Sequence, residues 1–137
     1  MRKILFRGRT KDGKWCYGDY VHAIRFNGVR GFHNDWIIPG VYGNGGWISM
    51  RGKDAVEGDT VGQYTGLTDK SGVKIFEGDI VDVNNTLLSG RFWVEYGLSG
   101  AFIVKDKDDR RYFLGGCNCV VAGNIYDNPE LLEEESE

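Results

Sequence analysis

Residues 76–105, FEGDIVDVNNTLLSGRFWVEYGLSGAFIVK, are the part of this chain of 137 residues that decides the fold class. The stretch holds three runs rich in Val, Ile and aromatic residues, at 79–83, 91–96 and 101–105. Such runs, separated by Gly, Asn and Ser, are typical of short β-strands joined by turns. In the middle run Phe92, Val94 and Tyr96 fall on one side of the predicted strand, and Arg91, Trp93 and Glu95 fall on the other.

The same pattern continues on both sides of this stretch. Two further runs follow, at 111–114 and 120–126, and residues 61–66 precede a turn at 69–72. Five short runs with regular turn spacing after residue 78 predict a small SH3-like or barrel-like sheet.

The N-terminal part is predicted to form β-hairpins. Asp12-Gly13 separates two alternating segments, and Asn27-Gly28 separates two further β-prone runs. Both dipeptides favour tight hairpin turns because they accept positive φ. Residues 31–52 carry a weaker signal, with one edge strand expected at 36–38, where Pro39 ends it.

These patterns predict a mainly β protein with three segments. Residues 1–66 form an N-terminal β-hairpin region with a glycine-rich central loop, and residues 67–126 form the barrel-like sheet. Residues 127–137 form a short C-terminal helix, opened by Asn128-Pro129, and an acidic tail. One integrated domain is the alternative division.

The composition indicates a folded protein of a reducing cytosol. Hydrophobic residues make up 41% and charged residues 27%, which is typical of globular chains and excludes wholesale disorder. Three cysteines, an odd number, fit reduced thiols better than a disulfide framework. Arg7 interrupts the first apolar run far short of a signal peptide, and no run is long enough for a membrane helix. We therefore expect a cytoplasmic protein without a membrane partner.

The tetrapeptide pattern Gly-Asp-x-Val occurs three times, beginning at Gly18, Gly58 and Gly78. We interpret each copy as a turn that leads into a strand, with the aspartate accepting local backbone N–H groups. Carboxylates that converge on a metal ion are the less favoured interpretation.

Candidate catalytic and metal-binding groups are few. Cys117 and Cys119, with His22 and His33, include the right ligand types for zinc, but their spacing is not that of paired zinc knuckles. Two residues apart in a strand, both thiols would face the core instead. We therefore expect no metal, no cofactor and no catalytic residues. A cysteine-dependent enzyme is the weakest alternative, because nothing beside the cysteines indicates an activated thiolate.

Charge is distributed unevenly along the chain. Residues 1–18 hold six basic residues against Asp12 alone, a net charge of +5, whereas the whole chain has a net charge of −3. Cations interleaved with aromatic rings are what proteins use to bind single-stranded nucleic acid. The candidate nucleic-acid-binding residues are Arg7, Arg9, Lys11, Lys14 and Trp15. The alternative is a solvated hairpin whose aromatic rings belong to the core.

Four blocks of the sequence resemble the YopX family of phage and prophage proteins. They are Phe6-Arg7-Gly8 with Asp12-Gly13-Lys14-Trp15 and Tyr17-Gly18; residues 61–67 with Asp69 and Gly72; residues 75–81; and residues 123–132. The resemblance covers nearly the whole chain and thins between residues 23 and 53. It implies a β-rich fold with a barrel-like C-terminal half and a life inside a bacterial host cell. It implies no accepted activity and no catalytic residues.

Together these observations favour a non-catalytic binding or assembly module that engages a protein partner or associates with itself. Small β-barrels expose strand edges and loops that suit such contacts. Binding of single-stranded nucleic acid through the N-terminal hairpin is the alternative.

Overall fold

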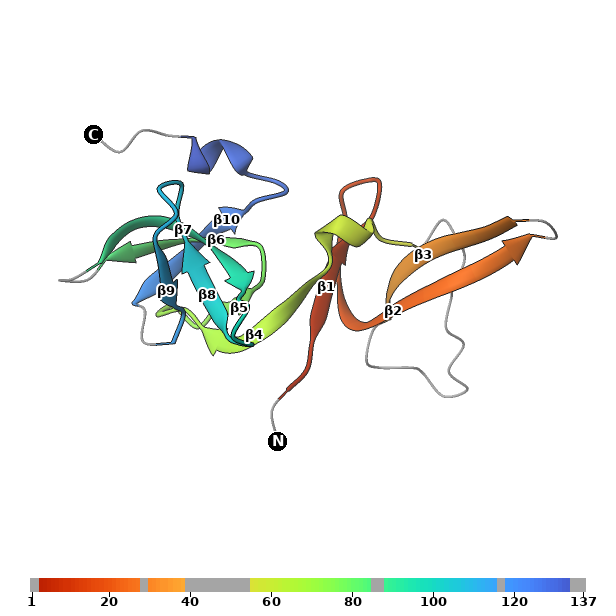
Figure 1. Cartoon of the computed structure of the whole chain (residues 1–137), viewed down its shortest axis with the longest axis horizontal. Helices are drawn as coiled ribbons and strands as arrows, with labels where there is room; N and C mark the ends of the chain where they lie inside the picture. Colours follow the sequence, from red (N-terminus) through yellow and green to blue (C-terminus); the bar gives the residue numbers. More distant parts are fainter. Residues whose placement is uncertain (1–2, 28–29, 39–54, 85–87, 116–117, 134–137) are drawn as a thin grey trace. The chain divides into compact units, whose positions relative to one another are not determined.

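The computed structural model describes residues 3–27, 30–38, 55–84, 88–115 and 118–133 (Figure 1), and the backbone alone for the described residues between 23 and 33. It is a mainly β structure, as the sequence predicted. Its strands are β1 (Phe6–Arg9), β2 (Trp15–Asn27), β3 (Arg30–Ile38), β4 (Gly62–Thr68), β5 (Lys74–Phe76), β6 (Asp79–Asn84), β7 (Ser89–Tyr96), β8 (Phe102–Lys105), β9 (Arg111–Phe113) and β10 (Cys119–Asn124). Two short 3₁₀ helices accompany them, η2 (Gly58–Thr60) and η3 (Pro129–Leu132).

The chain divides into two compact units, Met1–Gln63 and Tyr64–Glu137. The boundary falls inside β4, whereas the sequence-based division was placed after Gly66. The first residues of β4 pair with β1 in the first unit, and Tyr64 pairs with Phe76 of β5 in the second. The segment after residue 126 belongs to the second unit.

In the first unit, β1 and β2 form the hairpin predicted around Asp12-Gly13. Arg9 pairs with Trp15, and the Thr10 N–H donates to the Lys14 carbonyl at 2.9 Å to close the turn. Gly13 has a φ of 89°, a conformation that other residues adopt at a cost. Gly13 therefore adopts the positive φ that the Asp12-Gly13 dipeptide predicted for a tight turn.

A second hairpin, β2–β3, continues the first unit. Its register runs from Asn27 opposite Arg30 to Asp19 opposite Ile38. The strand order places β3 at a sheet edge, so the predicted edge strand at 36–38 is confirmed and extends back to Arg30. Trp36 is buried at 1% exposure and anchors this strand.

The core of the first unit depends on a close approach at Gly8. A Cβ at this position would lie 2.8 Å from Cγ2 of Val56 and 3.1 Å from Cγ1 of Ile37, which is closer than carbon atoms pack. Glycine thus lets β1 lie directly against the buried Val56, which also bridges to Asp35 of β3.

In the second unit, five strands form a sheet in the order β10-β6-β7-β8-β9. The five runs predicted between residues 79 and 126 correspond to these strands. Figure 1 shows the sheet curling, with the β4–β5 hairpin beside it. Val81, Phe92 and Val104 are fully buried in its core, and Ile75 of β5 packs in the same cluster. The unit is therefore barrel-like. Phe92 and Val94 lie on the inner face of β7 as their alternation indicated, whereas Tyr96, expected on the same side, is exposed at the end of the strand.

The helix predicted after Asn128 is a four-residue 3₁₀ helix, η3. Pro129 occupies its first turn, but the Asn128 side chain does not cap it. Instead, Asn128 Oδ1 accepts a hydrogen bond from the Asn124 N–H at 3.2 Å, which ties the segment to the end of β10. The helix η2 was not predicted.

Two copies of the Gly-Asp-x-Val pattern lead into a strand as interpreted, and in one of them the aspartate accepts a backbone N–H; the third copy does not form a turn. Gly78 has a φ of 91° just before β6, and the Asp79 carboxylate accepts the Phe76 N–H at 2.7 Å. Gly58 opens η2, which leads into β4. Gly18 lies within β2, where pairing with β1 continues the strand through the pattern.

Among the described helices, none has the length and apolar character needed to cross a bilayer.

Candidate functional site

The hairpin β1–β2 brings together four of the residues from the predicted cation and aromatic group. Arg7 lies opposite Tyr17 and Arg9 opposite Trp15. Because paired residues of antiparallel strands share a face, all four side chains lie on one face of the hairpin. The alternation of the sequence predicted the common face of Trp15 and Tyr17, and the register of β1 against β2 adds Arg7 and Arg9 to it.

The cations on this face differ in their surroundings. Arg7 is buried at 6% exposure, and its Cζ atom lies 4.8 Å from the centre of the Trp15 ring, at cation–π distance. Arg9 Nη2 lies 3.7 Å from Oε1 of Glu57. Lys11 and Lys14 are exposed. Of the five predicted nucleic-acid-binding residues, the two lysines are therefore the most accessible, and Arg7 packs on Trp15.

A hydrogen-bonded group of three polar side chains, which the sequence analysis did not identify, lies on β2 and β3. The Tyr20 hydroxyl donates to Asp35 Oδ1 at 2.6 Å, and His22 Nδ1 lies 2.8 Å from the same oxygen. Burial, and then the hydrogen bond to Asp35, raise the pKa of Tyr20 to about 12. The two-residue spacing of Tyr20 and His22 was a signal for a shared face, but the register that brings Asp35 opposite His22, and so within reach of Tyr20, was not visible.

The cysteines lie in different settings. Cys119 is buried at 3% exposure and packs in the core of the second unit, as expected for a thiol on an inner strand face. Cys16 is partly buried on β2. Cys117 and the His33 side chain lie outside the described residues, so the absence of a zinc site stays a prediction. In the described ranges, no three His, Cys, Asp or Glu side chains are grouped to hold a metal ion.

Buried aspartates hold two turns of the second unit. Asp69 Oδ1 accepts the N–H groups of Ser71 and Val73 at 2.8 and 2.9 Å, and its Oδ2 accepts the Val121 N–H at 2.9 Å. Asp106 accepts the N–H groups of Asp108 and Arg110 at 3.1 and 2.9 Å. Burial alone would raise the pKa of both carboxyls, but the donated hydrogen bonds lower each pKa below its ordinary value.

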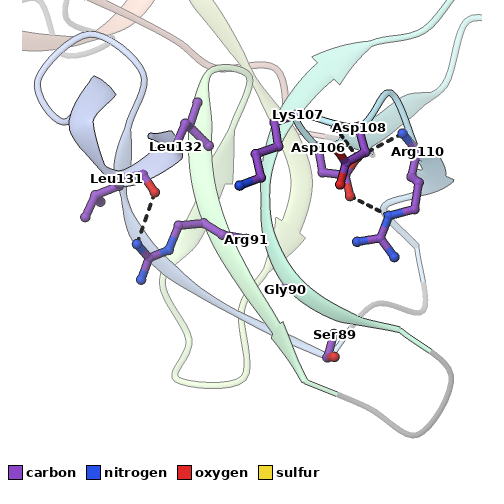
Figure 2. Close-up of a pocket in the computed structure, with 9 residues that line it drawn as sticks. All are labelled: Ser89, Gly90, Arg91, Asp106, Lys107, Asp108, Arg110, Leu131 and Leu132. Carbon is purple, nitrogen blue, oxygen red and sulfur yellow. Dashed lines mark hydrogen bonds and ion pairs between the residues drawn. The ribbon is translucent and has the colours of Figure 1, made fainter. Parts of the chain in front are cut away.

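A pocket of about 120 Å³ lies in the second unit, between the start of β7, the β8–β9 turn and η3 (Figure 2). Three cations and two carboxylates line it together with small and apolar residues. The lining residues are Ser89, Gly90, Arg91, Asp106, Lys107, Asp108, Arg110, Leu131 and Leu132.

The walls of this pocket are held by ion pairs and hydrogen bonds. Arg91 Nε donates to Asp82 Oδ1 at 2.8 Å, and its Nη1 donates to the Leu131 carbonyl at 3.1 Å. Arg110 Nε donates to Asp106 Oδ2 at 2.5 Å. Arg91 thus fixes η3 over one side of the pocket, and Asp106 fixes the β8–β9 turn on the other.

The second unit also exposes large apolar side chains around β7, β8 and β9. Leu98 in the β7–β8 turn is fully exposed, and Phe113 and Tyr96 are exposed at 67% and 57%. Tyr112 of β9 is exposed at 40%. We call these four residues the apolar edge. It was not anticipated, because exposure depends on which strand lies at the end of the sheet.

The comparisons with known proteins address the family and the fold. No curated protein matches the chain significantly. The crystal structure of protein EF1440 from Enterococcus faecalis is similar, with a TM-score of 0.52 and 22% sequence identity over 96% of this chain and 99% of that one. At this identity the similarity shows a shared fold. The model of the YopX protein family matches residues 6–133, nearly the whole chain. The chain therefore belongs to the YopX family.

Proposed function

We propose that this YopX-family chain is a phage- or prophage-encoded binding or assembly module without catalytic activity, working in the cytoplasm of a bacterial host cell. Its partner is a protein or a second copy of the chain. The observation that carries the proposal is the apolar edge: Tyr96 and Leu98 at the end of β7 and in the β7–β8 turn, and Tyr112 and Phe113 on β9, the last strand in the sheet order of the second unit.

The strand β9 is suited to pairing with a further strand. Among the named strands it pairs with β8 and ends the sheet order. The bonds from the Asp106 N–H to the Arg110 carbonyl and from the Leu114 N–H to the Phe102 carbonyl fix which backbone groups face β8. By the alternation of an antiparallel ladder, the backbone groups of Arg111 point to the other side.

An added strand would also find side-chain contacts on both faces of the sheet. Tyr112 lies opposite Val104 on the inner side, whereas Phe113 lies opposite Ile103 on the outer side. A strand laid along β9 would therefore meet one aromatic ring on each face, which is how strand addition combines main-chain bonding with side-chain selection. Aromatic residues are also enriched at protein interfaces.

The absence of catalysis is supported by how the buried polar groups are used. Asp69 and Asp106 receive hydrogen bonds from their own turns, and Asp79 accepts the Phe76 N–H. The Cys119 thiol packs among core side chains. Groups committed to holding backbone are poorly placed for proton transfer or nucleophilic attack, which need access to a substrate.

The test is affinity capture from host-cell extract with a double variant, Leu98→Ser with Phe113→Ser. We expect the wild-type chain to capture a defined partner, or itself, in nuclease-treated extract, and the double variant to lose it. The matched control is Leu67→Ser with Val73→Ser, which changes two exposed apolar residues elsewhere in the second unit and should retain capture. Light scattering over a concentration series separates self-association from a second protein.

Two results would contradict the proposal. Equal capture by the double variant would show that the apolar edge is not the contact surface. Capture that disappears on nuclease treatment would favour the alternative, single-stranded nucleic acid at the N-terminal hairpin. The shared face of Arg7, Arg9, Trp15 and Tyr17 favours that alternative, but the burial of Arg7 against Trp15 makes it the weaker of the two.

A further inference from the structure

We propose that the pocket lined by Arg91, Lys107 and Arg110 binds a phosphate monoester group. This site lies apart from the apolar edge and does not depend on the function proposed for that edge. The class of ligand follows from the charge of the pocket, from its volume, and from its having a charged wall and an apolar wall.

Lys107 is the residue that most directly indicates a ligand. Within the part of the chain that the structure describes, its side chain takes part in no hydrogen bond or ion pair. Figure 2 shows its ammonium group directed away from Asp106 and toward the side of the pocket on which Arg91 and Leu131 lie. Two cations thus face one hollow, and none of the described carboxylates bridges them, although a shared anion would stabilise both.

The other charged groups of the pocket are held in place before any ligand arrives. Arg91 is oriented by its bonds to Asp82 and the Leu131 carbonyl, and Arg110 by Asp106. Guanidinium groups held in this way are preferred partners of phosphate oxygens. Asp106 is engaged by its turn, which leaves Asp108 as the carboxylate that opposes an anion.

The dimensions limit the ligand to a single group. The pocket of about 120 Å³ is slightly smaller than an engineered cavity of about 150 Å³ that holds a single benzene molecule. That space accepts a phosphate but not a whole nucleotide, so the remainder of the ligand must extend outward. Leu131 and Leu132 offer this remainder an apolar wall. A monoester carries a charge of about −1.5 to −2 at pH 7, which suits the two cations that face the hollow, Arg91 and Lys107, better than the single charge of a diester.

The first experiment is a titration of the whole chain with inorganic phosphate, followed by the NMR signals of Leu131 and Leu132. We expect saturable shifts, weakened about tenfold by Lys107→Ala, the order of one charge-assisted hydrogen bond. Asp108→Asn should strengthen binding because it removes the opposing charge. Lys74→Ala, an exposed lysine of β5 in the same unit, is the matched control and should leave binding unchanged.

The second experiment separates the sources of such a group. A nucleoside 5′-monophosphate should bind more tightly than inorganic phosphate, and the nucleoside alone should not bind. Comparing 5′-phosphorylated with unphosphorylated oligonucleotide tells whether the end of a strand is preferred to the free mononucleotide. Equal binding of nucleoside and monophosphate, or unchanged binding in both Lys107→Ala and Asp108→Asn, would overturn the proposal. The double variant Leu98→Ser with Phe113→Ser should bind phosphate as the wild type does.

Discussion

The units Met1–Gln63 and Tyr64–Glu137 are both made of antiparallel strands and glycine-containing turns, yet they bury different kinds of side chain. The second unit closes around an apolar cluster in which Phe92 and Val104 are fully buried. The first buries Trp36 but also Arg7, and it links Tyr20 with His22 through Asp35. The second unit also buries Asp69, Asp79 and Asp106. Both units thus bury charged groups, but the first buries a cation packed on an aromatic ring, whereas the second buries carboxylates that accept backbone N–H groups.

The substitution with the largest expected effect is Phe92→Ala in the second unit. Removing this fully buried ring should cost about 3–5 kcal/mol of the free energy of unfolding. Phe113→Ala, the same change at 67% exposure, should cost less than about 1 kcal/mol. Urea unfolding measures the difference, and hydrogen exchange shows where protection is lost. Loss of protection in both units together would mean that they unfold as one cooperative body.

A smaller effect is expected for the turn aspartate in Asp106→Asn. The change weakens the hydrogen bonds that the carboxylate accepts, at a cost of about 1–3 kcal/mol at pH 7. Because the pKa of Asp106 is lower in the folded state, its contribution is present above the unfolded value of about 3.9 and is lost as the pH falls through the folded value. Stability measured from pH 7 to pH 2 should therefore fall less steeply in the variant. Parallel curves for the two proteins would contradict this assignment.

The smallest effect is expected in alkali, and it belongs to the first unit. With its pKa raised to about 12, Tyr20 should ionise well above the ordinary tyrosine pKa of about 10. Its contribution to stability is complete below the ordinary pKa of about 10 and is lost as the pH rises toward the folded value. Phenolate absorbance should show a late component that is missing from Tyr20→Phe. A Tyr20 component that titrates near pH 10, seen as the difference between the wild type and Tyr20→Phe, would refute the Tyr20–Asp35 bond.

The turns and strands of the second unit were predictable because their signals are local. Alternation assigned the inner face of β7, and Gly78 with Asp79 marked the start of β6. The strand β3 was largely missed because His33, Asn34 and Asp35 interrupt its apolar pattern. Those residues are extended because they pair with β2, which is a contact between strands rather than a preference of the segment.

In the candidate sites, too, local patterns were visible in the sequence, whereas contacts between distant residues were not. The common face of Trp15 and Tyr17 followed from the two-residue period of a strand, but the register that adds Arg7 and Arg9 to it, and the burial of Arg7, did not. The pocket combines three segments that are distant in the sequence, at residues 89–91, 106–110 and 131–132. No pattern of residue spacing in the sequence predicts that segments so far apart will line one pocket.

The sequence by itself determined the β class, the hairpin turns and the membership of the YopX family. These depend on backbone conformation and side-chain alternation, which neighbouring residues control. Only the tertiary structure decided that β9 lies at the end of the sheet, that Arg7 is buried, and that η3 and Lys107 line the same pocket. Those outcomes depend on the order of strands in the sheet, because burial and charge contacts arise between residues that only folding brings together.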